Sequence, residues 1–272
     1  MILEVKQTNA VKHNEFDVIR DGNVIYRGNA SWWKILEIDK LNKVNLTDPE
    51  GNVLLHTRYK MIDTFLGFTI PFKRQKGPEK KFCMYEILDA SEQVKAVFYS
   101  VERSAKDVRL CLSFDGRVID GYRRCIGLKE VVSFYENDTQ IGQITRSRTV
   151  VDHLDQYYVH FLPEYDQQLP LIAMYAVFYD FLYHNNSGNI GKNTKTISLA
   201  YTHDGYDDKY QPDFIRNHFG EQEDERINAL VPEKLNWAEN KKAMTGLIAA
   251  VLIPLLVILM FVLLFWYLGL SE

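Results

Sequence analysis

One apolar stretch, residues 169–183, decides the fold, and it reads LPLIAMYAVFYDFLY. The stretch is apolar nearly all round and opens with Pro170, which suits the first turn of a helix. As a helix it would extend only about 22 Å at about 1.5 Å per residue, and a bilayer needs about 20 residues. A helix that is apolar on every face must be surrounded, so we expect this one to be buried in protein.

A second membrane pass is the alternative interpretation of residues 169–183. It would place Asp180 inside the apolar segment, and no flanking cation lies nearby. Ionisable side chains are costly inside a bilayer. We therefore favour burial within a protein shell.

The residues before this helix can supply such a shell. Through residue 165 the chain repeats short runs rich in Val, Ile, Phe and Tyr, separated by turns that combine an acidic residue with Gly or Asn. This pattern is typical of β-hairpins. The expected strands are Ile2–Lys6, Glu15–Arg20, Val24–Arg27, Lys43–Leu46, Val53–Tyr59, Thr64–Phe72, Lys81–Leu88, Val94–Val101, Arg109–Phe114, Arg117–Tyr122, Glu130–Tyr135, Gln140–Arg146 and Gln156–Phe161.

Helical periodicity is absent from the same region, so the sequence predicts a mainly β fold in which an antiparallel meander closes into a barrel or a sandwich. A closed barrel of about twelve strands is wide enough to hold one helix in its centre. We expect residues 1–185 to form such a barrel around a central helix at residues 168–184.

The C-terminal tail contains a second and longer apolar segment. No charged residue occurs from Ala243 to Ser271, and this length suffices to cross a bilayer with some tilt. Pro254 would kink the helix, which membrane helices tolerate, and Trp266 and Tyr267 suit the interfacial aromatic belt. A buried core helix is the alternative, but the segment is longer than most globular helices and has no polar face. We predict a transmembrane helix at residues 243–270.

The charges that flank this span predict its orientation. Lys241 and Lys242 precede it, whereas only Ser271 and Glu272 follow. Cations are retained on the cytoplasmic side, and the first residues lack the apolar region of a signal peptide. We expect a single-pass, tail-anchored membrane protein with a cytoplasmic N-terminal domain. Its three widely spaced cysteines read as reduced thiols.

Residues 186–242 separate the expected barrel from the expected span. They are polar, and residues 204–242 hold ten acidic against six basic side chains. This composition predicts a linker with limited order that would hold the barrel away from an anionic membrane surface. Short helices are expected around Asp213 to His218 and Pro232 to Asn240.

The order of these elements resembles the tubby C-terminal fold shared by tubby-like proteins, plant LURP-one-related proteins and phospholipid scramblases. Three stretches carry the resemblance: the strand–turn–strand of residues 46–55, LTDPEGNVLL; residues 134–146, FYENDTQIGQITR, where a turn leads into a Gly-x-Ile-x-Arg strand; and the apolar helix at Leu169 to Tyr183. The resemblance covers residues 1–185, most of the chain outside the tail.

The resemblance implies a twelve-stranded barrel around a helix and, in some members, binding of phosphoinositides or other membrane lipids. It does not imply an enzyme. The Cys-rich stretch and the acidic calcium-type segment of the scramblases are not evident here, and the predicted span lies beyond the barrel helix. Calcium-triggered lipid scrambling is therefore not expected.

Motifs for catalysis or for cofactor binding are absent from the sequence. No G-x-S-x-G, P-loop, H-E-x-x-H or dinucleotide fingerprint occurs, so no catalytic residue and no cofactor are predicted. His153 and His160 lie seven residues apart, which places them on opposite faces of a strand, so no metal site is expected. A pI near 6.0 argues against nucleic acid as a partner.

The best candidate for ligand contact is a basic loop with five cations and one carboxylate between residues 73 and 81. Such a cluster can grip lipid phosphates or an acidic partner, although lysines that merely keep a hairpin loop solvated are the alternative. Arg146 and Arg148 would share one face of a strand and join it. The candidate binding residues are Lys73, Arg74, Lys76, Lys80, Lys81, Arg146 and Arg148.

The sequence thus favours a membrane-tethered, non-catalytic binding or scaffold module, with the lipid bilayer as partner of its tail and anionic lipid or a protein as ligand. A scramblase-like lipid-handling protein is the first alternative. An enzyme with an unrecognised arrangement of catalytic groups is the second, and a wall pocket lined by converging His, Asp and Arg would favour it.

Overall fold

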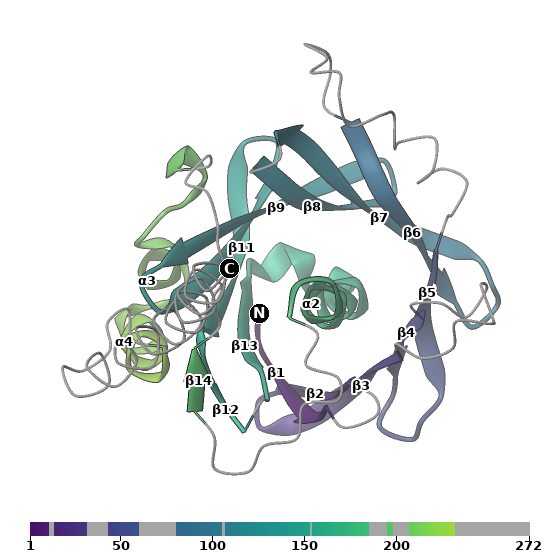
Figure 1. Ribbon diagram of the computed structural model, residues 1–272, viewed down its shortest axis with the longest axis horizontal. Coiled ribbons are helices and arrows are strands. Elements are labelled where there is room, and N and C mark those ends of the chain that lie inside the picture. Colours follow the sequence, from purple (N-terminus) through teal and green to yellow (C-terminus); the bar gives the residue numbers. More distant parts are fainter. Residues whose placement is uncertain are drawn as a thin grey trace, which may run out of the picture. The chain divides into compact units, whose positions relative to one another are not determined.

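The computed structural model describes residues 1–10, 14–31, 43–59, 80–104, 107–152, 154–184, 195–197 and 207–231. Within these residues twelve antiparallel strands form a closed barrel in the order β1-β13-β11-β10-β9-β8-β7-β6-β5-β4-β3-β2 (Figure 1). The strands are β1 (Ile2–Asn9), β2 (Asn14–Arg20), β3 (Asn23–Ser31), β4 (Lys43–Thr47), β5 (Val53–Tyr59), β6 (Lys80–Asp89), β7 (Val94–Ser104), β8 (Asp107–Phe114), β9 (Arg117–Ile126), β10 (Lys129–Glu136), β11 (Thr139–Ser147) and β13 (Gln156–Phe161).

These strands confirm the predicted β-barrel, and each of them overlaps a strand expected from the sequence. The expected strand at residues 64–72 lies outside the described residues. The acidic residue and the glycine of these turns form two-residue hairpins, as the sequence predicts. Such hairpins require left-handed backbone at both central positions. Asp21 and Gly22 have φ values of 51° and 78°, and Asp115 and Gly116 have values of 47° and 74°.

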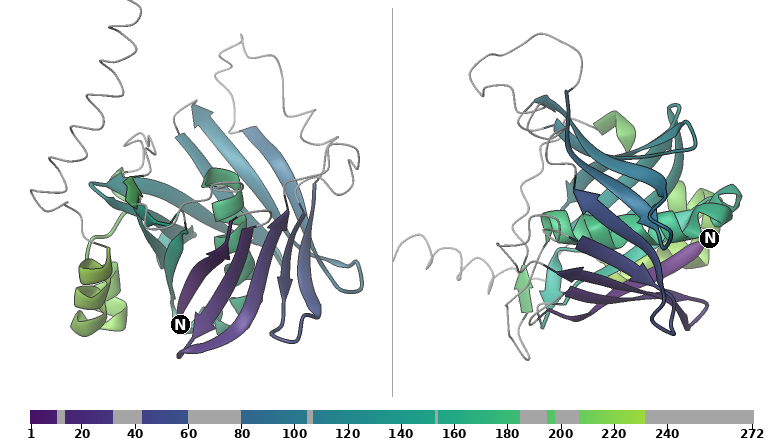
Figure 2. Two further views of the ribbon diagram at one scale, coloured as in Figure 1. Left: turned by 60° about the horizontal axis from the view of Figure 1, so that its bottom comes forward. Right: turned by 90° about the vertical axis from the view of Figure 1, so that its right-hand side faces the viewer.

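The apolar helix, α2 (Leu169–Tyr183), lies inside the barrel, as Figures 1 and 2 show. All ten residues from Ile172 to Phe181 are buried, so this helix and the strands share one core. Phe178 stacks on Phe98 of β7 with ring centroids 4.5 Å apart. Gly28 of β3 lets the helix approach closely, because a Cβ there would lie 2.6 Å from Val177.

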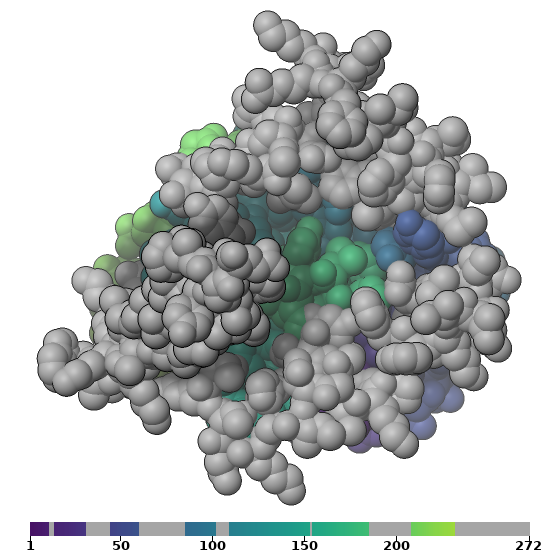
Figure 3. Space-filling view, in the orientation of Figure 1, coloured from purple at the N-terminus to yellow at the C-terminus, as the bar shows by residue number. Residues whose placement is uncertain are grey.

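The two ends of the barrel differ in their connections. At one end, called the turn end, short turns join β2 to β3, β4 to β5, β6 to β7, β8 to β9 and β10 to β11, and the 3-10 helix η2 (Pro163–Gln168) leads into α2. The opposite end, called the loop end, carries the remaining connections between strands and the C-terminus of α2. Seen from the loop end, green atoms of α2 occupy the centre of the face (Figure 3).

Residues 207–231 form a strap on the outside of the barrel, in a region where the sequence predicts a linker with limited order. The strap contains η3 (Asp207–Lys209), α3 (Phe214–Phe219) and α4 (Glu221–Leu230). The helix expected around Asp213 to His218 is α3, and the one expected at residues 232–240 lies outside the described residues. A small sheet pairs β12 (Thr149–Val151) with β14 (Lys195–Ile197).

Among the described residues, no helix is both long and apolar enough to cross a membrane. The predicted span at residues 243–270 lies outside those residues.

Candidate functional site

The described members of the predicted ligand-binding set occupy different parts of the barrel. Lys73, Arg74 and Lys76 lie outside the described residues, whereas Lys80 and Lys81 open β6 at the loop end. Of the two arginines, Arg146 is only 2% exposed, while the Arg148 guanidinium is partly exposed and donates to the Gly127 carbonyl at 2.7 Å. The structure therefore does not bring Arg146 and Arg148 to one exposed surface.

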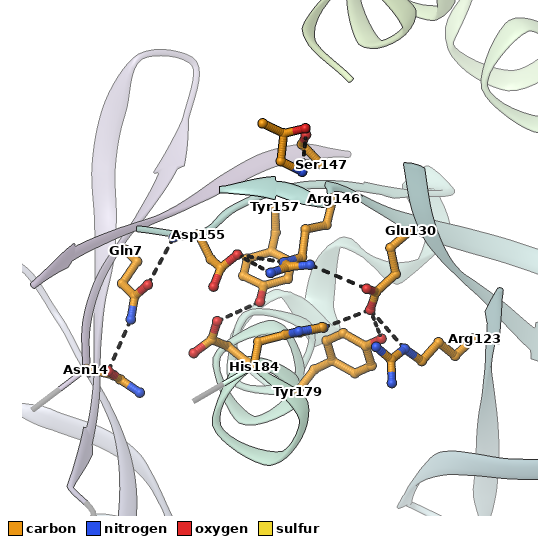
Figure 4. A network of polar contacts seen from close by, with 12 residues as sticks. Gln7, Asn14, Arg123, Glu130, Arg146, Ser147, Asp155, Tyr157, Tyr179 and His184 are labelled. Carbon is orange, nitrogen blue, oxygen red and sulfur yellow. Dashed lines mark hydrogen bonds and ion pairs between the residues drawn. The ribbon is translucent and has the colours of Figure 1, made fainter. Parts of the chain in front are cut away.

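Arg146 belongs instead to a chain of alternating charges inside the barrel wall (Figure 4). Its Nε and Nη2 atoms lie 2.7 and 2.5 Å from Oδ1 of Asp155. Its Nη1 atom lies 3.4 Å from Oε2 of Glu130, whose Oε1 accepts from Nε of Arg123 at 2.9 Å. The four groups run in the order carboxylate, guanidinium, carboxylate, guanidinium, so they neutralise one another.

Glu130 also joins the wall to the end of the central helix (Figure 4). The Tyr179 hydroxyl donates to its Oε1 atom at 2.5 Å, and Nε2 of His184 lies 2.8 Å from the same oxygen. Because an ionised carboxylate only accepts, the His184 Nε2 atom must carry a proton here. One buried carboxylate thus holds two residues of the helix end against β10.

Asp180 is the remaining ionisable group of this cluster and belongs to α2. Its Oδ1 atom accepts from the Tyr157 hydroxyl at 2.6 Å, and its Oδ2 atom has no hydrogen-bond partner among the described residues. The side chain is fully buried. We call Arg123, Glu130, Arg146, Asp155, Tyr157, Tyr179, Asp180 and His184 the inner network.

Burial and neighbouring charges set the protonation of this network. Burial alone would raise the pKa of Glu130, but the hydrogen bond from His184 and the charges of Arg123 and Arg146 hold it well below its ordinary value. Burial, and then the charge of Asp155, raises the pKa of Asp180 well above its ordinary value. Burial lowers the pKa of His184. Glu130 is therefore ionised, while Asp180 and His184 are neutral.

The sequence contained a signal for the inner network that motif analysis missed. Along β10, Glu130 has the same orientation as Val132 and Phe134, which lie in the barrel core. Along β11, Arg146 follows Ile144 at the same spacing and is paired directly with Glu130. A charged residue that continues the apolar face of a strand is expected to point into the core. A buried charge requires a partner of opposite charge, so the two residues are expected to pair.

A second set of polar contacts joins the strap to the outer face of the same strands. The buried His160 of β13 lies 2.7 Å from Oε1 of Glu223, and Arg226 lies 3.0 Å from Glu4 of β1. Lys129 of β10 donates to Asn228 at 2.6 Å. The apolar contacts of the strap involve Tyr158, Phe214, Ile215, Ile227 and Val231.

The described part of the chain offers little support for a metal site or for a reactive thiol. No group of three or more potential metal ligands occurs there, and His153 lies outside it. His160 faces the strap rather than another histidine. Cys111 is buried with its Sγ 3.0 Å from Asp120, and burial raises the pKa of this thiol, so it is a poor nucleophile.

The inner network can hold the helix in place. Its charged groups pair with one another inside the wall, so they make few contacts with solvent. The outer contacts can hold the strap. No protein family, curated protein or solved structure was found to match the chain.

Proposed function

We propose that this protein is a non-catalytic binding module with a tubby-like barrel, tethered to a membrane by residues 243–270 and recognising anionic phospholipid at the cytoplasmic face. The observation that carries this proposal is the filled interior of the barrel. The ten residues from Ile172 to Phe181 of α2 are buried in the core, so ligands are recognised from outside.

The inner network supports a non-catalytic role. His184, Asp155 and Arg146 converge inside the wall, which is the arrangement that would favour an enzyme. However, the Arg146 guanidinium lies between two carboxylates, and His184 donates to Glu130. These three side chains are buried, and their hydrogen bonds and ion pairs are made with other residues of the network rather than with a substrate. We therefore assign them to holding the helix.

The position of β6 supports the basic loop as the site of lipid recognition. This strand begins at Lys80 at the loop end, so the basic loop that precedes it joins the barrel there. The cations of this loop are Lys73, Arg74, Lys76, Lys80 and Lys81. Clustered cations bind anionic lipid headgroups, with about 1 kcal/mol for each Lys or Arg near the surface.

The tether is tested with the full chain and with a chain that ends at Lys242. We expect the full chain to stay with membranes during alkaline extraction, and the shortened chain to be released. Release of both forms, or retention of both, would contradict a tether at residues 243–270.

Lipid recognition is tested with the chain that ends at Lys242, so that the tail does not contribute. Sedimentation with vesicles of phosphatidylcholine, with and without phosphatidylserine, measures the selectivity for anionic lipid. We expect binding that requires phosphatidylserine and is lost when the five cations of the basic loop are replaced by Ala. Equal binding by this variant would remove the loop from the site.

The matched control replaces by Ala four exposed cations on the wall, Lys6, Arg27, Arg58 and Lys95, and one on the strap, Arg216. It changes the net charge by the same amount, and exposed ion pairs contribute little to stability. An equal loss of binding in this control would point to net charge rather than to the loop. Absence of binding to both vesicles would favour an acidic protein partner, and lipid transbilayer movement by the purified full chain would favour the scramblase-like alternative.

A further inference from the structure

The strap determines where the chain leaves the barrel. The residues of α4 contact the outer wall at successive levels between the two ends. Glu223 lies against His160, which pairs with Ile2 at the turn end. Arg226 lies against Glu4, two residues further along β1.

The next contact of α4 lies at the loop end. Asn228 accepts from Lys129, the first residue of β10, which pairs with Ser147 at the end of β11. The helix therefore runs along the wall from the turn end towards the loop end, and α4 ends only two residues later, at Leu230. Val231 is fully buried, so this direction is fixed up to the last described residue.

The strap also shortens the tether. Without it, the last described residue held by a strand is Ile197 of β14, and residues 198–242 would form a tether of 45 residues, with a reach of about 160 Å. With Val231 fixed on the wall, eleven residues precede the predicted span, and at about 3.5 Å each they reach about 38 Å. A ten-residue strand such as β9 has a length of about 33 Å. A barrel with its turn end against the bilayer would therefore use nearly the full extension of the tether merely to pass its own wall.

The charges at the two ends of the barrel also favour a loop end that faces the membrane. The connections of the turn end contain eight carboxylates and no Lys or Arg: Asp21, Asp48, Glu50, Glu92, Asp115, Asp138, Glu164 and Asp166. Neighbouring cations pair with some of them, as Arg20 does with Asp166 and Lys209 with Asp138. The strand connections of the loop end contain nine Lys or Arg and six Asp or Glu. An anionic bilayer repels the first end more than the second.

We propose that docking of α4 on β10, β13 and β1 orients the barrel on the membrane, with the loop end facing the lipid headgroups and the acidic turn end facing away. This proposal rests on the proposed tether at residues 243–270. It replaces a barrel on a long, free stalk by a barrel held close to the bilayer in one orientation.

Energy transfer from the two ends of the barrel to the membrane surface tests this orientation. Val94 at the turn end and Val151 at the loop end are similarly exposed, at 49% and 55%. Val94→Cys and Val151→Cys are each made in the full chain, labelled with a donor dye and reconstituted in vesicles of phosphatidylcholine and phosphatidylserine with a headgroup acceptor. The chain without either substitution gives the background from its native cysteines.

We expect several-fold more transfer from position 151 than from position 94, because the two ends lie about one strand length, about 30 Å, apart. Equal or reversed transfer in protein that floats with the vesicles would overturn the orientation and leave the tether intact. Failure of the chain to float with vesicles would overturn the tether and the orientation with it.

Release of α4 tests the role of the strap. Ile227→Asp places a charge in the apolar contact, and Arg226→Glu opposes Glu4 and Glu223 with less disturbance of packing. In either variant the tether lengthens, so we expect the difference between positions 94 and 151 to shrink. A difference that persists while hydrogen exchange shows α4 released would overturn the role assigned to the strap, and circular dichroism verifies that the barrel stays folded.

Discussion

The inner face of β10, β11 and β13 and the outer face of β10, β13 and β1 each carry a charged network, and the comparison between the two networks separates a fixed contact from a releasable one. On the inner face, Arg146 and Glu130 are 2% and 1% exposed. On the outer face, the Arg226 side chain is 37% exposed and its partner Glu4 is 25% exposed. Solvent replaces the partners of the outer groups if the strap lifts, but cannot reach the inner ones.

The two networks also differ in what they join. The inner network ties α2 to the wall that surrounds it, so breaking it requires the barrel to open. The outer network attaches a short helix, α4, to the wall, and the ten residues of this helix would be only marginally helical by themselves. The same strands thus hold a permanent element on one face and a detachable element on the other.

The largest effect is expected from Arg146→Met, which leaves two buried carboxylates without the guanidinium between them. Removal of one partner from a buried ion pair costs about 3–5 kcal/mol, and we expect a loss of that size in the free energy of unfolding. Urea denaturation of the chain ending at Lys242 measures it. Arg148→Met is the matched control, because Arg148 makes an exposed bond to Gly127, and its loss should stay below about 1 kcal/mol. Similar losses in both variants would contradict a fixed inner network.

The next effect is expected from Ile227→Ala in the strap. Ile227 is 2% exposed, and truncation of a buried Ile costs about 2–5 kcal/mol. We expect this loss to be local, with faster hydrogen exchange in α3 and α4 and little change in β10 and β11. Leu230→Ala, at a side chain that is 48% exposed, should leave the exchange of the strap nearly unchanged. Equal acceleration in barrel and strap would show that the two faces are not separable.

A smaller effect is expected from acid on the strap. Burial lowers the pKa of His160 despite its contact with Glu223, whose pKa is lowered to about 2. A base with a lowered folded pKa stabilises the fold fully above its ordinary pKa of about 6.5, and this contribution is lost as the pH falls below that value. Hydrogen exchange in α4, corrected for intrinsic rates, should therefore accelerate between about pH 7.5 and 5.5. His160→Gln should remove most of this acceleration, and an unchanged pH dependence would exclude His160 as its source.

The smallest effect is expected from Asp180→Asn inside the barrel. Burial raises the pKa of Asp180, so its stabilising contribution is complete below its ordinary pKa of about 3.9 and declines as the pH rises towards the folded value. The neutral Asn keeps an oxygen for the Tyr157 hydroxyl. We expect a change below about 1 kcal/mol near pH 4, where the carboxyl is largely protonated in the folded and the unfolded chain, and a weaker decline of stability in the Asn variant as the pH rises towards neutral. A loss as large as that of Arg146→Met in urea denaturation would mean that Asp180 is ionised.

The sequence by itself determined the strands and the helix. Alternation of β-forming residues and acidic turns predicts hairpins because the strand period and the left-handed turn conformation depend on adjacent residues. A helix at residues 169–183 would be apolar on every face, which predicts that it is buried. Because the preceding residues are predicted to form strands, a barrel is the structure that can enclose it. These features are local, which is why the predicted bounds of α2 agree with the structure.

Only the tertiary structure decided the partners of the charges and the place of the strap. The β10–β11 hairpin pairs Arg146 directly with Glu130, but only the closed barrel brings Asp155 to Arg146 and Tyr179 and His184 to Glu130. Apart from the short helix expected around Asp213 to His218, the strap is polar, and no local pattern separates it from a linker. Its docking depends on Ile227 and Val231 meeting Tyr158, which the sequence places some 70 residues away. Contacts of this kind are set by the closed barrel, because only the packed wall removes water from both partners.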